Sequence, residues 1–383
     1  MSEETIELYK ERERRMEDAI DLKIPDRVPV VFYDEAFVAK HADVTVMDYT
    51  LDQKKRLFAI KKFLKDFEPD VFEDILQTHP FMIGYEECCR IKLPGIDLPP
   101  DEIFQLIEEE LIGVEGYDHM SRYGLMASML ELLPKISEYY APTMTIGIFN
   151  FLSVMLPGFL SLASQIRRTK EWGFPTWWGS ILMDPFSKLS YLRSHPKFCL
   201  DLYRSPDKIR RTAEKMLPQW IDTLCMINEF TGVPRAGVGM HRSGISIISQ
   251  KHFEEIAFPE MKKIADILVS RGLTPCFHCD GDWTQNLPYL RELPKGKCVV
   301  EFDQSTDIYK AKDILGGRLC IMGNIQENEV AMSSPAKIEE HCRTLIDKVG
   351  EGGGYVMRIE SSDDAKPKNV KAVMDAAKKY GVY

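Results

Sequence analysis

The sequence predicts an α/β protein built as a (β/α)8 barrel of the TIM type, with an N-terminal helical extension. Three observations favour this fold class. After Ser205, five strand-helix units follow one another without interruption. Their strands are nearly continuous apolar runs joined to the helices by short loops, which is typical of a parallel sheet covered by helices. No GxGxxG pattern follows the early strands, which argues against an open dinucleotide-binding sheet.

The N-terminal part is expected to hold the extension and the first strands. The chain of 383 residues could hold one large barrel or two domains, and we expect an extension at 1–24 and one barrel domain at 25–383. Residues 2–22 have a charged helical pattern, and 28–32 read as the first strand. The other expected elements are an amphipathic helix at 51–67, a short strand at 70–72, a helical elaboration around 98–140 and a strand at 142–156.

The second half of the chain alternates plainly between strands and helices. Ser205-Pro206 is a helix-start signal, and the strand after that helix ends at His241-Arg242. Most later strands also end in polar residues and lead into a helical pattern. The expected helices cover 207–229, 251–270, 283–292, 308–315, 336–349 and 367–380, and the expected strands cover 235–240, 274–279, 298–302, 319–322 and 355–358.

Composition and charge narrow the classes of function. Hydrophobic residues make up 44% of the chain and charged residues 28%, as in a soluble globular protein. The formal net charge of -10 disfavours nucleic acid as a partner. The apolar stretch 144–162 is broken by polar residues, Pro157 and Gly158, so we expect no membrane span. The nine cysteines and the acidic, signal-free start predict a protein of the reducing cytoplasm.

The stretch 274–283 carries the most informative chemistry. An apolar strand stops at His278-Cys279-Asp280, and Gly281 then breaks the chain. Because strand side chains alternate between faces, His278 and Asp280 point one way and Cys279 the other. This end of a strand is where the chemistry of an α/β fold sits. The pair could be two metal ligands or a base with its orienting carboxylate, and a histidine that only caps the strand is the structural alternative.

Other polar residues are expected at the same mouth of the barrel, where strands end and helices begin. Each has a structural alternative: Asp303 could cap the next helix, Asn324 could be a turn residue, and Arg242 could form an ion pair. The sequence has neither a nucleophile elbow nor a phosphate-binding loop. The expected mouth residues are Tyr33, Asp34, Glu73, Asp74, Asn150, His241, Arg242, His278, Asp280, Asp303, Gln304, Asn324, Gln326 and Glu360.

Several motifs resemble those of the uroporphyrinogen decarboxylase superfamily. They are Pro-Asp-Arg-Val-Pro-Val at 25–30, His-Cys-Asp-Gly at 278–281, Met-Gly-Asn-Ile at 322–325, and Gly-Gly-Tyr at 353–355 followed by Lys-Pro-Lys-Asn-Val-Lys-Ala at 366–372. The resemblance covers essentially the whole chain and implies a (β/α)8 barrel. It implies either cofactor-free decarboxylation of a tetrapyrrole, or methyl transfer between a corrinoid protein and an acceptor with zinc held by His-x-Cys and a later Cys.

The chain departs from both branches, and most from the decarboxylases. That branch has Arg-Gln-Ala-Gly-Arg after the first strand to bind substrate carboxylates, whereas 32–37 read Phe-Tyr-Asp-Glu-Ala-Phe. Two acids there would repel an octacarboxylate porphyrinogen. In the methyltransferase branch, His278 matches the first zinc position, and Asp280 stands where a cysteine is usual. Glu360 is the candidate for the third position, which would make a harder, oxygen-rich site.

The resemblance and the residues together predict a methyltransferase that moves a methyl group between the cobalt of a corrinoid protein and a thiol, folate or similar small molecule. Catalysis and zinc binding are expected of His278, Asp280 and Glu360. The family also allows a homodimer. Two alternatives stay open: a metal-free tetrapyrrole decarboxylase with Asp74 or Asp34 as proton donor, and a non-catalytic corrinoid- or tetrapyrrole-binding barrel. Substrate binding is expected of His241, Arg242, Asp303, Asn324, Tyr33 and Asp74.

Overall fold

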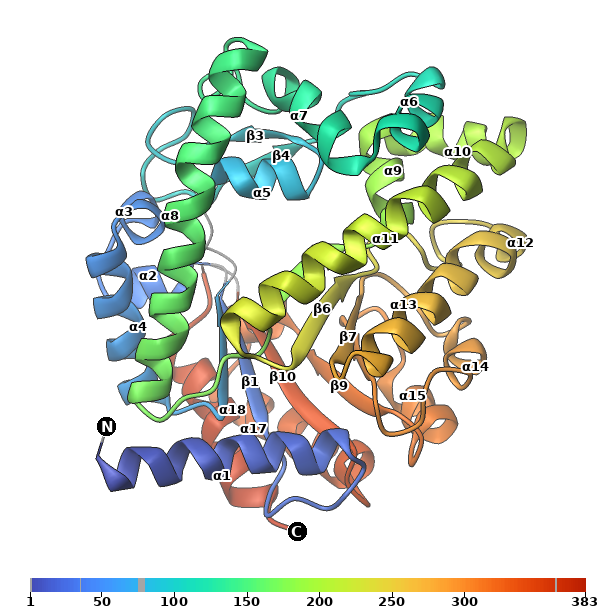
Figure 1. Cartoon of the computed structure of the whole chain (residues 1–383). Coiled ribbons are helices and arrows are strands. Elements are labelled where there is room, and N and C mark those ends of the chain that lie inside the picture. The colour runs from blue at the N-terminus through green and yellow to red at the C-terminus, as the bar shows by residue number, and fades with distance from the viewer. Residues whose placement is uncertain (1, 35, 75–79, 362–363) are drawn as a thin grey trace.

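The computed structural model describes residues 2–34, 36–74, 80–361 and 364–383. Its centre is an eight-stranded parallel sheet that curls upon itself and is ringed by helices (Figure 1). The strand order is β2-β1-β10-β9-β8-β7-β6-β5, and one parallel bridge between Phe72 and Thr176 links the two edges. The strands are β1 (Val30–Asp34), β2 (Val71–Asp74), β5 (Ser180–Met183), β6 (Arg235–Gly239), β7 (Thr274–Cys279), β8 (Val299–Phe302), β9 (Cys320–Ile325) and β10 (Tyr355–Ser361).

Helices surround this sheet, and their ends follow local sequence signals. The longest after β5, α11, begins at Ser205-Pro206 with proline in its first turn and stops at Gly232 in the left-handed region at φ 69°. The helices are α1 (Glu3–Ile20), α2 (Phe37–His41), α3 (Val46–Leu51), α4 (Gln53–Phe67), α8 (Met144–Glu171), α9 (Pro185–Arg193), α10 (His195–Arg204), α11 (Pro206–Thr231), α12 (Gln250–His252), α13 (Phe258–Ser270), α14 (Leu287–Leu290), α15 (Ile308–Leu315), α16 (Glu327–Met332), α17 (Pro335–Leu345) and α18 (Pro367–Tyr380), with π-helical turns η2 (Phe253–Ala257) and η3 (Ile346–Gly350).

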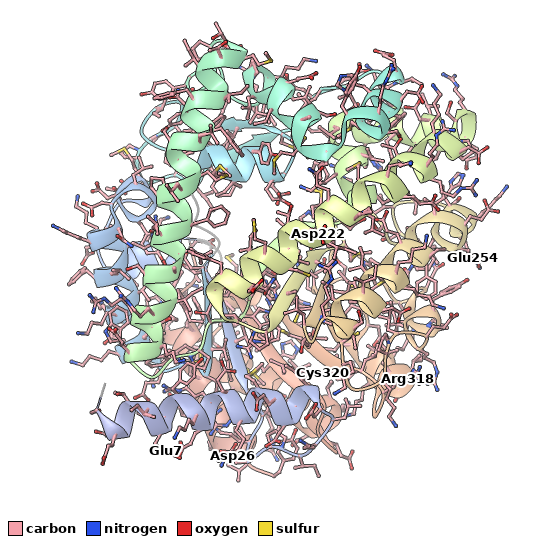
Figure 2. The ribbon with its side chains drawn as sticks, viewed as in Figure 1. Glu7, Asp26, Asp222, Glu254, Arg318 and Cys320 are labelled. Atoms are coloured by element: carbon pink, nitrogen blue, oxygen red, sulfur yellow. The ribbon has the colours of Figure 1, made fainter. Side chains whose placement is uncertain are left out.

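The N-terminal helix closes one end of the sheet. As predicted, a helix opens the chain, and α1 lies across the end where the strands begin (Figure 1). Arg15 of α1 pairs with Asp70, just before β2, at 2.6 Å and with Asp26 (labelled in Figure 2) at 2.5 Å. Glu13 pairs with the buried Arg235 at the start of β6 at 2.8 Å. These ion pairs occupy the N-terminal ends of the strands and leave the carboxyl ends for chemistry.

A smaller layer, which we call the cap, lies at the opposite end of the molecule from α1 (Figure 1). It is inserted between β2 and α8, and its described part covers residues 80–140. Its elements are α5 (Pro80–Glu86), β3 (Arg90–Lys92), β4 (Gln105–Ile107), α6 (Glu115–Tyr123) and α7 (Leu125–Ile136), with β3 and β4 forming a separate antiparallel pair.

The alternation expected after Ser205 is confirmed, with strands that run further than the sequence indicated. β9 extends to Ile325 and β10 to Ser361 because each keeps pairing with its neighbour through polar residues. β2 likewise includes Glu73 and Asp74, which pair with β1 in register. Glu73, Asp74 and Glu360 therefore lie within strands rather than beyond them. The sequence pattern does not predict β5.

The prediction of a strand at 142–156 is wrong, because most of this stretch forms the first half of α8. Thr143 caps the helix, its side chain accepting from the backbone N–H of Ile146 at 3.3 Å. An apolar run without charges fits a strand or a helix equally well, and pattern alone does not separate them. Asn150, expected at a strand end, instead sits in this helix and donates to the Tyr140 carbonyl at 2.7 Å.

By length and composition, α8 is apolar enough to cross a membrane. Its most apolar window of 18 residues has a mean hydropathy of 1.8, and 17% of that window is buried. A single helix of this kind is weak evidence for a membrane span, because core helices of soluble proteins and signal sequences can be equally long and apolar. Its exposed apolar side chains are Met144, Ile146, Phe149, Leu152, Leu156 and Leu160.

Candidate metal centre at the strand ends

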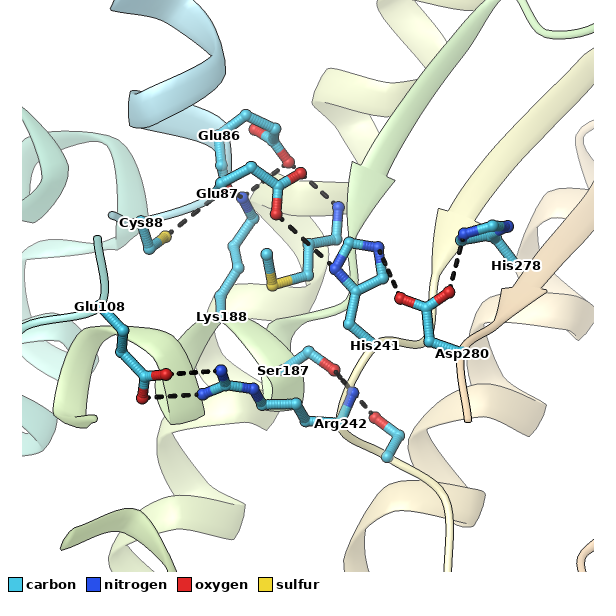
Figure 3. Close-up of polar contacts among 12 residues, drawn as sticks. Glu86, Glu87, Cys88, Glu108, Ser187, Lys188, His241, Arg242, His278 and Asp280 are labelled. Carbon is cyan, nitrogen blue, oxygen red and sulfur yellow. Dashed lines mark hydrogen bonds and ion pairs between the residues drawn. The ribbon is translucent and has the colours of Figure 1, made fainter. Parts of the chain in front are cut away.

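Three metal-ligating side chains converge where β6 and β7 end. His278 belongs to β7, Asp280 follows that strand, and His241 follows β6 (Figure 3). Nε2 of His278 lies 2.9 Å from one oxygen of Asp280, and Nε2 of His241 lies 3.9 Å from the other. One ligand atom of each residue falls within 4.8 Å of the other two. Two imidazoles and a carboxylate thus form a candidate metal-binding triad.

A glycine in β6 makes room for this triad. Gly239 stands opposite His278 in the register of β6 and β7. A Cβ atom at Gly239 would lie 2.7 Å from Nε2 of His241, closer than van der Waals contact allows. The missing side chain therefore lets the imidazole of His241 fold back over its own strand toward His278.

Each imidazole also has a glutamate behind it. Nδ1 of His278 lies 2.6 Å from Glu301, which is its partner in the register of β7 and β8 and is 1% exposed. Nδ1 of His241 lies 3.6 Å from Glu87 of the cap. Both rings thus turn Nε2 toward Asp280 and Nδ1 toward a carboxylate. Metal-binding histidines usually have such a second partner, which fixes the ring and its tautomer.

The charges of the centre depend on one another. Burial alone would lower the pKa of His278, but Asp280 and Glu301 outweigh it and raise that pKa well above its ordinary value. Burial would raise the pKa of Asp280, yet His278 and His241 hold it below its usual range. The metal-free centre therefore contains an imidazolium between two carboxylates. A metal ion would replace that proton, as ligand binding to a metal generally requires.

A buried arginine continues the network across the sheet. Arg358 of β10 is 3% exposed, and its Nε lies 2.9 Å from Glu301. Its Nη1 lies 3.3 Å from Glu360, and its guanidinium stacks over the ring of Tyr33 at 4.3 Å. Burial raises the pKa of the nearby Glu73 carboxyl well above its ordinary value, although Arg358 opposes that rise. Arg358 thus pairs with two carboxylates, Glu301 and Glu360, and the buried Glu301 would be costly without it.

A polar pocket of about 220 Å³ opens beside the triad. Asp280 belongs to both, so a molecule in the pocket would lie next to the candidate metal ligands. Among the described residues that line the pocket, four side chains are carboxylates, three are amides, and Arg358 is the single cation. The lining residues are Asp280, Phe302, Asp303, Gln304, Gly323, Asn324, Ile325, Gln326, Glu327, Arg358 and Glu360.

The structure groups His278 and Asp280 with His241 rather than with Glu360. The carboxylate of Glu360 pairs with Arg358 instead, and it lines the pocket without belonging to the triad. Asp303, Gln304, Asn324 and Gln326 also line the pocket. The helix-capping role considered for Asp303 is wrong, because Asp307 caps α15. Asp303 instead accepts from the backbone N–H groups of Gly281 at 2.7 Å and Ser305 at 2.6 Å.

The other expected mouth residues are not among those that line the pocket, although Tyr33 and Glu73 lie beside Arg358, which does line it. Asp34 and Asp74 are buried, and they accept hydrogen bonds from the backbone of Val38 at 3.0 Å and from Gln165 at 3.2 Å. Asp34 therefore does not form the acidic lip that the sequence suggested, and the second acid of that lip lies outside the described residues. Arg242 turns to the cap and pairs with Glu108, the structural alternative considered for it.

Sequence reasoning missed three residues of this network. Glu301 and Arg358 each stand inside an apolar strand, and a charge in that position is a signal for a buried ion pair. Glu87 lies more than 150 positions before His241 and carries no local signal, because only folding brings the cap to the strand ends.

Comparison with known proteins identifies the family of this chain. Residues 165–380 match the family model of uroporphyrinogen decarboxylase (URO-D), so the chain belongs to that family. Two curated uroporphyrinogen decarboxylases are similar over shorter stretches. The protein of Idiomarina loihiensis is 29% identical over 102 residues, and that of Hydrogenovibrio crunogenus is 24% identical over 153 residues. These matches cover 26% and 35% of this chain and span only 27% and 40% of the two relatives.

A solved structure matches nearly the whole chain. A methyltransferase from Methanosarcina mazei superposes with a TM-score of 0.71, over 96% of this chain and 98% of that one. The two sequences are 12% identical, so this likeness shows a shared fold.

Proposed function

We propose that this protein is a metal-dependent methyltransferase that moves a methyl group between the cobalt of a corrinoid protein and a small acceptor such as a thiol or a folate. The observation that carries the proposal is the triad of His241, His278 and Asp280 at the edge of a polar pocket, with a glutamate behind each imidazole. The fold shared with the Methanosarcina methyltransferase supports it.

The donor set of the triad fits zinc. Two histidine nitrogens and one carboxylate oxygen with a fourth position open are a usual ligand set of catalytic zinc. His241 would take the place that the sequence suggested for Glu360. When bound, zinc would supply Lewis acidity that lowers the pKa of an acceptor, so that the acceptor reacts as an anion near neutral pH. The glutamates behind the rings would keep Nε2 of each imidazole as the ligand atom.

The pocket residues would bind and orient the acceptor. Its amide side chains offer both hydrogen-bond donors and acceptors, which suits a small polar molecule. The one cation of the lining, Arg358, is already paired with Glu301 and Glu360. Among the described residues, the pocket lining therefore has no spare positive charge for a polyanion. It favours a small neutral or weakly charged acceptor, so a thiol fits it better than a folate.

The setting of the reaction is part of the proposal. Pockets for drug-sized ligands are about 300–1,000 Å³, so a pocket of about 220 Å³ is large enough for a small acceptor but not for a corrinoid, which a partner protein would carry.

We infer that the sheet closes as a (β/α)8 barrel, and the bridge between Phe72 and Thr176 supports this closure. All nine cysteines are free thiols, which suits a cytoplasmic protein. A homodimer stays a prediction.

Decarboxylation of a tetrapyrrole is the second candidate, and the names of the curated relatives favour it. The pocket is small for a tetrapyrrole, and its acids would repel the carboxylates of one. The proton donors considered for this reaction, Asp34 and Asp74, are buried. We therefore rank this reaction below methyl transfer.

The proposal is tested by metal analysis and by a methyl-transfer assay. Protein purified without chelator is expected to hold close to one zinc ion per chain and to demethylate methylcobalamin anaerobically with one of a panel of thiols and folates. Asp280→Asn should lose both properties, because it removes the anionic ligand of the triad. Zinc-free protein with full activity would contradict the proposal. Carbon dioxide release from uroporphyrinogen would favour decarboxylation, and corrinoid binding without turnover in zinc-loaded protein would favour a non-catalytic binding protein.

A further inference from the structure

We propose that two residues of the cap, Glu87 and Glu108, position His241, so that the seating of the cap on the sheet sets the affinity of the triad for its metal. This proposal rests on the metal site of the proposed function and deepens it. It assigns the cap a role in metal binding at the ends of β6 and β7.

Glu87 reaches His241 from the cap side. It follows α5, and its carboxylate lies 3.6 Å from Nδ1, whereas Nε2 of the same ring faces Asp280 (Figure 3). The side chains of Glu87 and His241 are 22% and 16% exposed, so water screens their contact only partly. At 3.6 Å the carboxylate of Glu87 is too far from Nδ1 of His241 for a direct hydrogen bond. A carboxylate in this place still favours the ring orientation and tautomer that present Nε2 to a metal.

The turn that carries Glu87 is tied to the sheet by buried contacts. Lys188 of α9, whose side chain is 4% exposed, donates to the carbonyl oxygen of Glu86 at 2.6 Å and to its carboxylate at 2.7 Å. That carboxylate also accepts from the backbone N–H of Met183, at the end of β5, at 3.1 Å. Cys88, directly after Glu87, has a φ of 55°, which a non-glycine residue keeps only where its surroundings impose it. Glu87 is therefore held in a fixed place.

A second cap residue holds the loop on which His241 sits. Glu108, just after β4, makes a bidentate ion pair with Arg242 at 2.7 and 3.0 Å (Figure 3). The guanidinium of Arg242 stacks over the ring of Tyr191 at 3.6 Å. The backbone N–H of Arg242 donates to Ser187 Oγ at 3.1 Å. Three contacts thus hold Arg242 in place: its backbone N–H with Ser187, its guanidinium with the ring of Tyr191, and its ion pair with Glu108. They also restrain the adjacent His241.

These contacts couple the cap to the metal. Any displacement of the cap would separate Glu87 from His241 and Glu108 from Arg242, and both changes would free the imidazole to turn away from Asp280. Coupling between two sites is reciprocal, so a metal that requires His241 in place must in turn stabilise the seated cap. Cap motion and metal affinity are therefore two readouts of one equilibrium.

The test compares two variants with a matched control. Glu87→Gln and Glu108→Gln each remove one of the proposed contacts. Glu109→Gln removes a neighbouring cap carboxylate that pairs instead with Arg90 at 3.7 Å, with both side chains at least 40% exposed. Zinc affinity is measured by titration against a chelator, and cobalt(II) absorption reports the ligand geometry. We expect Glu87→Gln to weaken zinc binding about 10-fold, since loss of the partner of a metal-binding histidine costs about 10–100-fold.

Glu108→Gln should weaken binding to a smaller extent, and Glu109→Gln should leave it unchanged. Thermal unfolding should shift equally little in all three variants. A double-mutant cycle isolates the route of the effect: in a His241→Ala background, Glu87→Gln should add no further loss. Amide exchange in residues 80–140 should slow when zinc is added to the wild type.

The outcomes separate this proposal from the one it rests on. If the wild type binds zinc, and Glu87→Gln and Glu108→Gln bind it as tightly as Glu109→Gln does, the positioning role is refuted and the metal site stands. An equal loss from Glu87→Gln with and without His241 would also refute it, because Glu87 would then act by another route. If the wild type binds no zinc, the metal site falls, and this proposal falls with it.

Discussion

Replacing Glu301 by glutamine tests the buried charge network most directly. Glu301 is 1% exposed and faces two cationic groups, Nδ1 of His278 at 2.6 Å and Nε of Arg358 at 2.9 Å. Burial would raise its pKa, but Arg358 and His278 lower it, so the carboxylate is ionised in the folded protein. Glutamine keeps the shape of the side chain and removes its charge. Arg358 then keeps Glu360, at 3.3 Å, as its remaining close anion.

The expected cost follows from the burial. Removing one partner of a buried ion pair costs about 3–5 kcal/mol. The remaining contact of Arg358 with Glu360 puts the cost of this variant at the lower end of that range, about 3 kcal/mol. Globular proteins unfold with an entropy of about 2.1 cal/mol/K per residue, which for 383 residues is about 0.8 kcal/mol/K. The midpoint of thermal unfolding should therefore fall by about 4 °C.

A surface pair of the same chemistry is the control. Glu329 lies 2.7 Å from Nδ1 of His341, with side chains 31% and 24% exposed. Glu329→Gln should cost less than about 1 kcal/mol, as exposed pairs do, and should shift the midpoint by about 1 °C or less. Scanning calorimetry of both variants at one pH measures the difference. Equal shifts would refute the claim that Glu301 stabilises the interior through its buried charge.

Three further predictions follow from the site and the core. Gly239→Ala should weaken zinc binding by at least about 10-fold with little loss of stability, because its methyl group would displace the imidazole of His241 rather than backbone. Titration and thermal unfolding together check this, and unchanged affinity would contradict it. Glu360→Gln should change zinc affinity by no more than a few-fold, since Glu360 is not in the triad. Loss of zinc binding in this variant would instead show that Glu360 is a ligand. Burial raises the pKa of Glu260, so this group favours the folded state below the ordinary glutamate pKa of 4.5. That contribution to stability is lost as the pH rises toward the pKa that Glu260 has in the folded protein. Glu260→Gln can still accept from the N–H of Phe186, and it should remove this loss of stability with rising pH, which urea unfolding between about pH 5 and pH 8 measures.

The pairing of His278 with Asp280 shows what sequence can predict well. Two residues apart at the end of one strand, they had to share a face, and their side chains lie 2.9 Å apart. The regular alternation after Ser205 was predictable for the same reason, because apolar period and turn residues act over a few positions. The identity of the third member of the triad was not. His241 and Glu360 both end up near the mouth of the sheet, and the choice between them depended on Gly239 and Arg358, which lie on different strands.

The region from β2 to β5 was the hardest to predict. The uncharged run of α8 has no periodic contrast to separate helix from strand, and the cap makes its decisive contacts with distant residues. Glu87 shows this best, since its neighbours in the sequence give it no distinguishing pattern. Its place beside His241 follows from the ion pair between Glu86 and Lys188, two residues about 100 positions apart.

The amino-acid sequence by itself determined the class of fold, the strand-helix order of the second half, and the His-x-Asp pair at the end of β7. These depend on interactions between residues close in the chain, which are the same in any fold. Only the tertiary structure decided that His241 completes the triad, that glutamates stand behind both rings, and that the cap reaches the strand ends. Those contacts join residues far apart in the chain, and their energies come from burial and charge pairing that exist only once the sheet has curled.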